Sequence, residues 1–271
     1  MDHGDHRPRK RFGQNFLTDQ RVIADILRAV HARPGETVAE IGPGRGALTE
    51  GLIASGASLH LVEIDRDLAA LWRARTGPAL QLHEKDALHF DFSSIPAEPG
   101  ALRVVGNLPY NISTPLIFHL LAQSASIRDM HFMLQREVVD RMAASPGTAD
   151  YGRLTVMVQY QCRVDPVLEV PPGAFFPAPK VHSAVVRLVP GHFDHGVAQS
   201  AHMLALLVRQ AFTQRRKTLR NALSGLLDSA GISSLGIDPQ RRPETLSVSE
   251  FVRLSDAAHA AGAVPEAEGE D

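Results

Sequence analysis

The first half of the chain alternates short apolar runs with longer amphipathic stretches. Continuous apolar runs of about five residues predict buried strands, whereas apolar residues spaced three and four apart predict helices with one buried face. The strands predicted in this way are Thr37–Ile41, Leu59–Glu63, Leu80–His83, Arg103–Gly106 and Met130–Leu134. The predicted helices between them are Ala47–Ala54, Leu68–Arg75 and Pro115–Ala122. This β-α-β alternation is typical of a mostly parallel sheet covered by helices.

The pattern changes in the second half of the chain. A helix is predicted at Tyr151–Cys162, and two strands are predicted at Pro166–Val170 and Ser183–Val189. A proline-rich loop, Pro171–Lys180, joins these strands, which favours an antiparallel edge to the sheet. The segment Pro190–Ser200 has no hydrophobic periodicity and is predicted to be a linker.

Helical spacing dominates beyond the linker. One helix is predicted over Met203–Leu227, and a last one over Val248–His259 begins at a cap formed by Ser247 or Ser249. We therefore expect a Rossmann-like α/β domain over residues 1–192 and a small all-α domain over 200–260. The Ala/Glu-rich residues 261–271 are expected to form a disordered acidic tail.

The charges of the chain are informative where they cluster, whereas its net charge is close to zero. The 271 residues are 44% hydrophobic, enough for one substantial core and a smaller second unit. The formal net charge of −2 becomes +2 without the four acidic residues between positions 266 and 271, so the tail masks a mildly basic body. Five cations crowd one segment of the predicted helical domain: Arg209, Arg215, Arg216, Lys217 and Arg220.

The cysteine and histidine content argues against several classes of protein. Cys162 is the only cysteine, which excludes an intrachain disulfide and a multi-cysteine zinc site. The thirteen histidines show no spacing typical of metal ligands, and no apolar run approaches the roughly 18 residues of a membrane span. We expect a cytoplasmic, monomeric protein with no metal and no membrane partner.

A glycine-rich segment, Glu40–Gly46, follows the first predicted strand and precedes a predicted helix. Glycines at such a turn let a ligand approach backbone N–H groups, so Gly42 and Gly44 are candidate cofactor-binding residues. A dinucleotide site would place a third glycine where Ala47 stands. Pro43 also removes an N–H where a phosphate would need one. A nucleoside cofactor without phosphate therefore fits this loop better than NAD.

Two acidic residues extend this candidate site. Glu63 ends the second predicted strand, about 20 residues after the glycines, where a carboxylate accepts both ribose hydroxyls. Asp86 follows the third predicted strand and can accept a hydrogen bond from an adenine amino group. The alternative is that both are ordinary surface acids. Together with the glycines, they predict a site for an unphosphorylated adenosine moiety, with the sulfonium side of S-adenosylmethionine near the glycine loop.

The segment Asn107-Leu108-Pro109-Tyr110 follows the fourth predicted strand. An adenine amine is a weak nucleophile, because its lone pair is delocalised into the ring. If the Asn107 side-chain oxygen and the Leu108 carbonyl each accept one N–H, they favour a tetrahedral nitrogen with a localised lone pair. Pro109 stiffens the turn, and Tyr110 offers a face on which a target base can stack. The alternative is a plain β-turn with Tyr110 in the core.

Two adjacent phenylalanines lie in the proline-rich loop. Phe175 or Phe176 can stack on the target base opposite Tyr110, or both rings can anchor the loop to the core. From the residues alone, both alternatives remain open.

Taken together, these motifs resemble the KsgA/RsmA family of ribosomal RNA adenine dimethyltransferases. The resemblance covers nearly all of residues 10–225. It is carried by Lys10–Leu17, Glu40–Thr49, Asn107–Thr114, Tyr151–Leu154, Phe175–Val181, Arg209–Phe212 and Arg215–Arg220.

The resemblance implies several roles that the residues alone do not. Asn15 and Leu17 would close over the methionine end of the cofactor, and Phe175 would be the phenylalanine that stacks on the base. The implied substrate is a pair of adjacent adenosines in the 3′-terminal hairpin loop of 16S ribosomal RNA, each receiving two methyl groups on N6. The partner would be the immature small ribosomal subunit.

The clustered cations have two interpretations. On one continuous helix Arg209, Arg216 and Arg220 would form a stripe, with Lys217 beside it, that follows an RNA backbone. The alternative is a solvated helix face.

Other functions remain open. The chain can be an assembly or transcription factor whose methyltransferase activity is dispensable, a 23S ribosomal RNA adenine methyltransferase, or a dinucleotide-dependent oxidoreductase. Pro43 and Ala47 disfavour the oxidoreductase.

Overall fold

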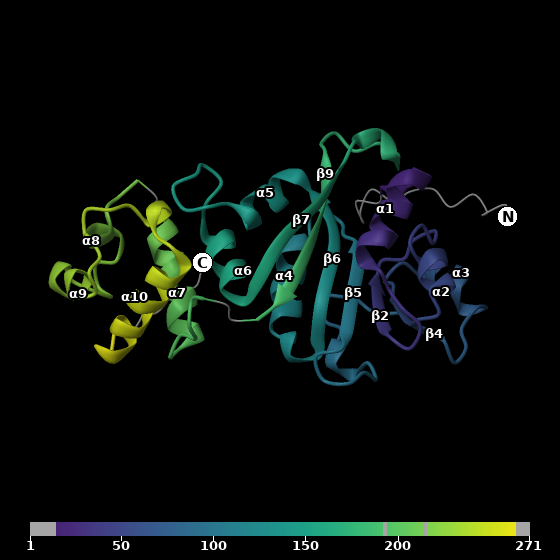
Figure 1. Cartoon of the computed structure of the whole chain (residues 1–271), viewed down its shortest axis with the longest axis horizontal. Helices are drawn as coiled ribbons and strands as arrows, with labels where there is room; N and C mark the ends of the chain where they lie inside the picture. Colours follow the sequence, from purple (N-terminus) through teal and green to yellow (C-terminus); the bar gives the residue numbers. More distant parts are fainter. Residues whose placement is uncertain (1–14, 192–193, 214–215, 264–271) are drawn as a thin grey trace. The chain divides into compact units, whose positions relative to one another are not determined.

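A computed structural model describes residues 15–191, 194–213 and 216–263 (Figure 1). These residues form two compact units. The sheet unit comprises the described residues up to Val139 together with Val164–Pro190, and the helical unit comprises Asp140–Arg163 and the described residues from Gly191 onward. The expected first domain, 1–192, thus differs from the sheet unit by the segment 140–163.

The sheet unit contains a seven-stranded sheet in the order β4-β3-β2-β5-β6-β9-β7. Its strands are β2 (Thr37–Ile41), β3 (Ser58–Val62), β4 (Leu80–His83), β5 (Leu102–Asn107), β6 (Ile127–Gln135), β7 (Cys162–Val170) and β9 (Ser183–Pro190). The strands from β4 to β6 are parallel, and β9 runs antiparallel to β6. The predicted Rossmann-like sheet with an antiparallel edge is confirmed.

Helices follow the strands in the order expected of β-α-β units. They are α1 (Gln20–Val30), α2 (Thr49–Ala54), α3 (Arg66–Arg73), α4 (Ser113–Leu121) and α5 (Arg136–Ala143). Helix α1 begins where the Asp19 carboxylate accepts hydrogen bonds from two backbone N–H groups, and it buries Ile23, Ile26 and Val30 on one face. It packs the start of the described chain into the core of the sheet unit.

A short antiparallel ribbon joins two distant parts of the sequence. Strand β1 (Phe16–Leu17) pairs with β8 (Phe175–Phe176), with Phe16 opposite Phe176 and Leu17 opposite Phe175. The Thr18 backbone N–H extends the pairing by donating to the Ala174 carbonyl at 2.8 Å. The loop predicted at Pro171–Lys180 therefore contains a strand that is paired with the N-terminal segment.

The helical unit contains α6 (Arg153–Gln161), α7 (Ala201–Thr213), α8 (Leu219–Ala222), α9 (Ser229–Ser234) and α10 (Val248–Ala260). Helix α6 is buried on several sides and contacts α7 and α10, which explains why the segment 140–163 belongs here. The Tyr151 hydroxyl donates to the Leu246 carbonyl at 2.7 Å, and the Tyr160 hydroxyl accepts from the Ala198 N–H at 3.1 Å. Ser247 caps α10, one of the two caps expected.

The single helix predicted over Met203–Leu227 is wrong. Helix α7 ends at Thr213, and α8 begins at Leu219 after an extended residue, Thr218. The Gln210 side-chain amide donates to the carbonyls of Ala222 and Ser224, so a side chain of α7 satisfies backbone groups at the end of α8. Apolar residues at helical spacing continue across the break because both short helices bury one face.

Candidate active site

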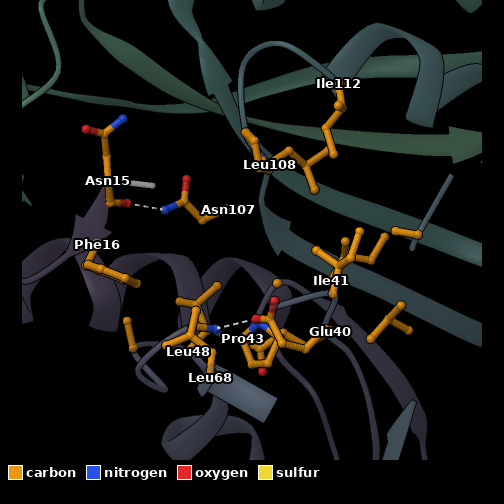
Figure 2. Close-up of a pocket in the computed structure, with 18 of the residues that line it drawn as sticks. Asn15, Phe16, Glu40, Ile41, Pro43, Leu48, Leu68, Asn107, Leu108 and Ile112 are labelled. Carbon is orange, nitrogen blue, oxygen red and sulfur yellow. Dashed lines mark hydrogen bonds between the residues drawn. The ribbon is translucent and has the colours of Figure 1, made fainter. Parts of the chain in front are cut away.

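One cavity of the sheet unit lies at the carboxyl edge of the parallel strands. Parallel strands deliver the loops that follow them to the same edge, which is where ligands bind in open α/β sheets. The wall is built from residues 15–17, the loop after β2, the ends of β3 and β5, and the turn after β4. Figure 2 shows several of these side chains converging from β1, β2 and the segment after β5. The cavity brings together ten residues expected at the site: Asn15, Leu17, Gly42, Gly44, Glu63, Asp86, Asn107, Leu108, Pro109 and Tyr110.

The glycine loop has a backbone shape that only glycine adopts readily. Gly42 and Gly44 have φ angles of +63° and +54°, in the left-handed region. A Cβ at Gly46 would lie 2.7 Å from the ring of Trp72, so this position leaves no room for a side chain. The Trp72 indole N–H donates to the Gly44 carbonyl at 3.1 Å. The loop is therefore held in place by a buried tryptophan that the sequence analysis did not single out.

Glu63 is buried behind the loop and held in position by backbone donors. Its carboxylate accepts from the Asp65 N–H at 2.9 Å and from the Gly44 N–H at 3.4 Å. Burial raises the pKa of Glu63, and these two hydrogen bonds partly offset that effect. The carboxylate thus connects the glycine loop to the end of β3 and lines the cavity, as a ribose acceptor would.

Glu40 is a second buried acid in the cavity wall, and the sequence analysis missed it. Its side chain is only 2% exposed, and burial raises its pKa to about 8. The nearby Glu63 carboxylate adds to this effect. Within the described residues, one of its carboxyl oxygens has no hydrogen-bond partner. A charged residue inside the apolar run of β2 was the signal available in the sequence.

Asp86 lies in the cavity wall but is partly engaged by its own turn. One oxygen accepts from the Leu88 N–H at 3.0 Å, and the other lies 3.4 Å from the His89 imidazole. Each oxygen can accept more than one hydrogen bond, so this turn leaves acceptor capacity for a ligand.

The segment after β5 forms a turn that faces the cavity. The Ile112 N–H donates to the Pro109 carbonyl at 3.2 Å, as in a β-turn, and the Leu108 N–H donates to the Met133 carbonyl of β6 at 3.1 Å. The Asn107 amide nitrogen donates to the Asn15 carbonyl at 3.0 Å (Figure 2). The Tyr110 hydroxyl lies 2.8 Å from that of Ser183 at the start of β9. The segment is therefore a β-turn that also lines the cavity.

In β8, Phe175 is buried and Phe176 is exposed, whereas the resemblance implied that Phe175 is available to stack on the base. Phe175 is 5% exposed, packs in the hydrophobic core with Leu17 and does not line the cavity. Phe176 is 66% exposed. Alternation along a strand sends neighbouring side chains to opposite faces, and the pairing with β1 turns the face of Phe175 toward the core. In this structure the Phe175 ring is not placed to stack on a base.

The expected basic stripe does not exist as a single helical face. Arg209 lies on α7, Arg216 and Lys217 lie between helices, and Arg220 lies on α8. All four are exposed, and Arg215 lies outside the described residues. The loop before α10 packs beside α8, because the Leu219 N–H donates to the Arg241 carbonyl at 2.8 Å. The cations thus belong to one unit but come from separate elements.

Other candidate chemistry is limited. Burial raises the pKa of the Cys162 thiol to about 12, which keeps it protonated and unreactive at neutral pH. Across the described part of the chain, no group of three or more histidine, cysteine or acidic side chains is arranged to hold a metal ion. None of the helices in the described ranges has the length and apolar character that crossing a bilayer requires.

The residues present fit an adenosine-containing cofactor without a pyrophosphate. A Cβ at Gly42 would meet nothing within 4 Å, so the glycine loop leaves open space in the cavity wall. Glu63 supplies acceptors that are held in position, and an exposed apolar side chain, Ile64, lies beside them in the wall. This fold, with this loop and the Asn107 turn, defines an S-adenosylmethionine-dependent methyltransferase.

Comparisons with known proteins agree. The chain belongs to the ribosomal RNA adenine dimethylase family, whose profile matches residues 5–259. It is 59% identical over 253 residues to ribosomal RNA small subunit methyltransferase A of Pseudomonas savastanoi pv. phaseolicola, covering 93% of this chain and 94% of that protein. It is 56% identical to the protein of the same name from Chromobacterium violaceum, covering 95% and 98%.

Two solved structures share the fold over most of the chain. A dimethyladenosine transferase from Plasmodium falciparum has a TM-score of 0.73 at 25% identity, covering 88% of this chain and 95% of that one. The 23S rRNA methyltransferase ErmE has a TM-score of 0.67 at 26% identity, covering 90% and 100%.

Proposed function

We propose that this protein dimethylates the N6 amines of two adjacent adenosines in the 3′-terminal hairpin loop of 16S ribosomal RNA, in the immature small subunit. The relatives named small subunit methyltransferase A are 56–59% identical to this chain, whereas the 23S rRNA methyltransferase ErmE is 26% identical. This difference favours the small-subunit substrate over 23S ribosomal RNA. The observation that carries the proposal is the Asn107 turn opening onto the same cavity as the glycine loop.

In the proposed complex, residues from five segments hold the cofactor. Glu63 accepts the ribose hydroxyls and Asp86 accepts from the adenine amino group, while Gly42 and Gly44 leave room for the ligand. Asn15, Leu17 and Asn107 close the methionine end. S-adenosylmethionine supplies an electrophilic methyl group when bound. The neutral form of Glu40, favoured by its raised pKa, keeps a second negative charge away from Glu63.

The Asn107 turn then prepares the target amine. The hydrogen bond to the Asn15 carbonyl uses the amide nitrogen of Asn107, so the side-chain oxygen remains to accept from the adenine NH2. The Leu108 carbonyl accepts the second N–H, and together they localise the nitrogen lone pair. Pro109 restricts the turn, and Tyr110, anchored to Ser183, stacks on the base. The adenosine must leave its helical stack to reach this position.

The helical unit is proposed to contact the RNA backbone. Arg209, Arg216, Lys217 and Arg220 are exposed cations, and Arg215 lies in the same stretch of sequence. Such contacts are independent of base sequence and weaken as salt displaces them.

Labelled methyl transfer tests the proposal directly. Purified protein is incubated with labelled S-adenosylmethionine and small subunits from cells lacking this protein, and mass spectrometry locates dimethyladenosine in the RNA. We expect two adjacent N6,N6-dimethyladenosines near the 3′ end of 16S ribosomal RNA, and none with large subunits. Labelling of 23S ribosomal RNA alone would overturn the small-subunit assignment. Rescue of subunit assembly without any methyl transfer would instead indicate an assembly factor.

A further inference from the structure

Phe176 is an exposed ring that the fold does not require. It is 66% exposed and is the one aromatic residue among the exposed large hydrophobic side chains of the described residues. Burying such a side chain would normally stabilise the protein, so folding alone gives no reason for its exposure. Its neighbour Phe175 already anchors β8 in the core.

The strand register places Phe176 next to a residue of the cavity wall. Directly opposed residues of an antiparallel pair point to the same face, with Cβ atoms about 5 Å apart. Phe176 is opposite Phe16, and Phe16 lines the cavity with its ring close to Gly44. Phe176 therefore lies beside a wall residue, exposed at the edge of the cavity rather than inside it.

The surrounding chain suits a nucleobase. Pro177 and Pro179 restrict the backbone after Phe176, and Lys180 and Val181 are also exposed. The same loop leads to Ser183, which holds Tyr110. An exposed ring in a stiff frame is typical of stacking platforms that bind unpaired bases, and a lysine nearby suits the adjoining phosphate.

When one adenosine enters the cavity, the base next to it loses a stacking partner and remains outside. We propose that Phe176 stacks on this neighbouring base and so makes the enzyme prefer a purine beside the target. This inference rests on the proposed function. Phe176 is thus a specificity-determining residue that acts on substrate binding, and it leaves methyl transfer to the Asn107 turn.

The test compares two substrates and three variants. Small subunits are prepared in which the neighbour of one target adenosine is adenosine or uridine, and kcat and KM are measured for that target. With the adenosine neighbour, we expect Phe176→Ala to raise KM about tenfold, the loss typical of one base–aromatic stack. The kcat should stay within about twofold.

The same substitution should remove the preference for adenosine over uridine as neighbour, and Phe176→Trp should restore both properties. Val167→Ala, which shortens an exposed side chain of β7 outside the cavity wall, should behave as wild type. An unchanged KM in Phe176→Ala, or a loss confined to kcat, would overturn the inference while leaving the proposed function intact. Absence of methyl transfer by the wild-type protein would instead overturn both.

Discussion

The side-chain amide of Asn107 donates a hydrogen bond of 3.0 Å to the backbone carbonyl of Asn15, a residue 92 positions earlier in the chain. A carbonyl oxygen accepts only from the NH2 end of a carboxamide, so this contact fixes which end of Asn107 remains available. The start of the described chain, paired with β8 through Phe16 and Leu17, is thereby linked to the proposed catalytic turn. The orientation of one proposed catalytic side chain thus depends on contacts that local sequence cannot reveal.

Asn107→Ala should lower kcat about a hundredfold and weaken cofactor affinity far less. The lost oxygen matters most as the amine becomes tetrahedral, and removal of one such polar group typically costs 10²–10³ in kcat. Single-turnover methyl transfer and calorimetry with S-adenosylhomocysteine measure the two quantities separately. Gln81→Ala, which removes an exposed carboxamide from β4, serves as the control. Equal losses in both measurements would mean that Asn107 only positions the cofactor.

Glu63→Gln should weaken binding of S-adenosylhomocysteine by about 10- to 100-fold, with little change in kcat at saturating cofactor. The substitution keeps the shape of the side chain but removes the charge that strengthens hydrogen bonds to the ribose. Calorimetry gives the dissociation constant. Glu84→Gln, an exposed acid paired with Arg73, should bind as wild type does. An unaltered dissociation constant in Glu63→Gln would assign Glu63 to loop structure alone.

Hydrophobic runs predicted the sheet well because its central strands, β2, β3, β5 and β6, are buried on both faces. Thr37–Ile41 and Leu80–His83 were predicted with the bounds of β2 and β4, and the other strands differ at their ends. The ribbon of β1 and β8 was missed, since two-residue strands show no period. The break after Thr213 was missed as well, because α7 and α8 each continue an apolar spacing that a single helix would share.

The candidate site was predictable where the chemistry follows strand ends. Gly42, Glu63, Asp86 and Asn107 lie at or just beyond the ends of parallel strands, so topology alone brings them to one edge. Trp72 and Phe16 contact the glycine loop through tertiary packing, so nothing in the neighbouring sequence indicates these contacts. The pairing of β8 with β1 determines which of the two phenylalanines is buried. A change of one residue in that register would exchange the buried and the exposed ring.

Glu40→Gln should stabilise the protein more at pH 8 than at pH 5. The pKa of Glu40 is raised from about 4.5 to about 8, so between these values the folded state holds a proton that the unfolded state has released. Its contribution to stability is therefore full below about pH 4.5 and is lost as the pH rises toward 8. Glutamine does not titrate and removes this loss.

Denaturant unfolding at both pH values measures the effect. The difference in free energy of unfolding between Glu40→Gln and wild type should increase by at least about 1 kcal/mol from pH 5 to pH 8, since each unit of pKa shift is worth roughly 1.4 kcal/mol. Glu98→Gln, at an exposed glutamate, should show no such change. A difference that stays constant with pH would show that Glu40 is ionised in the folded protein.

Combined replacement of Arg216 and Lys217 by alanine should flatten the salt dependence of RNA binding. Each cation that contacts a phosphate adds about one to the slope of log affinity against log salt, so the slope should fall by about two. Binding to small subunits is measured over a range of salt concentrations. Arg28→Ala removes an exposed cation of α1 that is paired with Asp25, and it should leave the slope unchanged. An unchanged slope in the double variant would exclude these two residues from the RNA contact.

Phe175 and Phe176 should differ sharply in their effect on stability. Phe175 is packed in the core against Leu17, so Phe175→Ala leaves a cavity and should lower the free energy of unfolding by about 3 kcal/mol or more. Phe176→Ala removes an exposed ring and should change it by no more than about 0.5 kcal/mol. Thermal and denaturant unfolding of the isolated protein compare them without any RNA. Similar small losses in both variants would mean that Phe175 is free to leave the core, and would return it to the position of base-stacking residue.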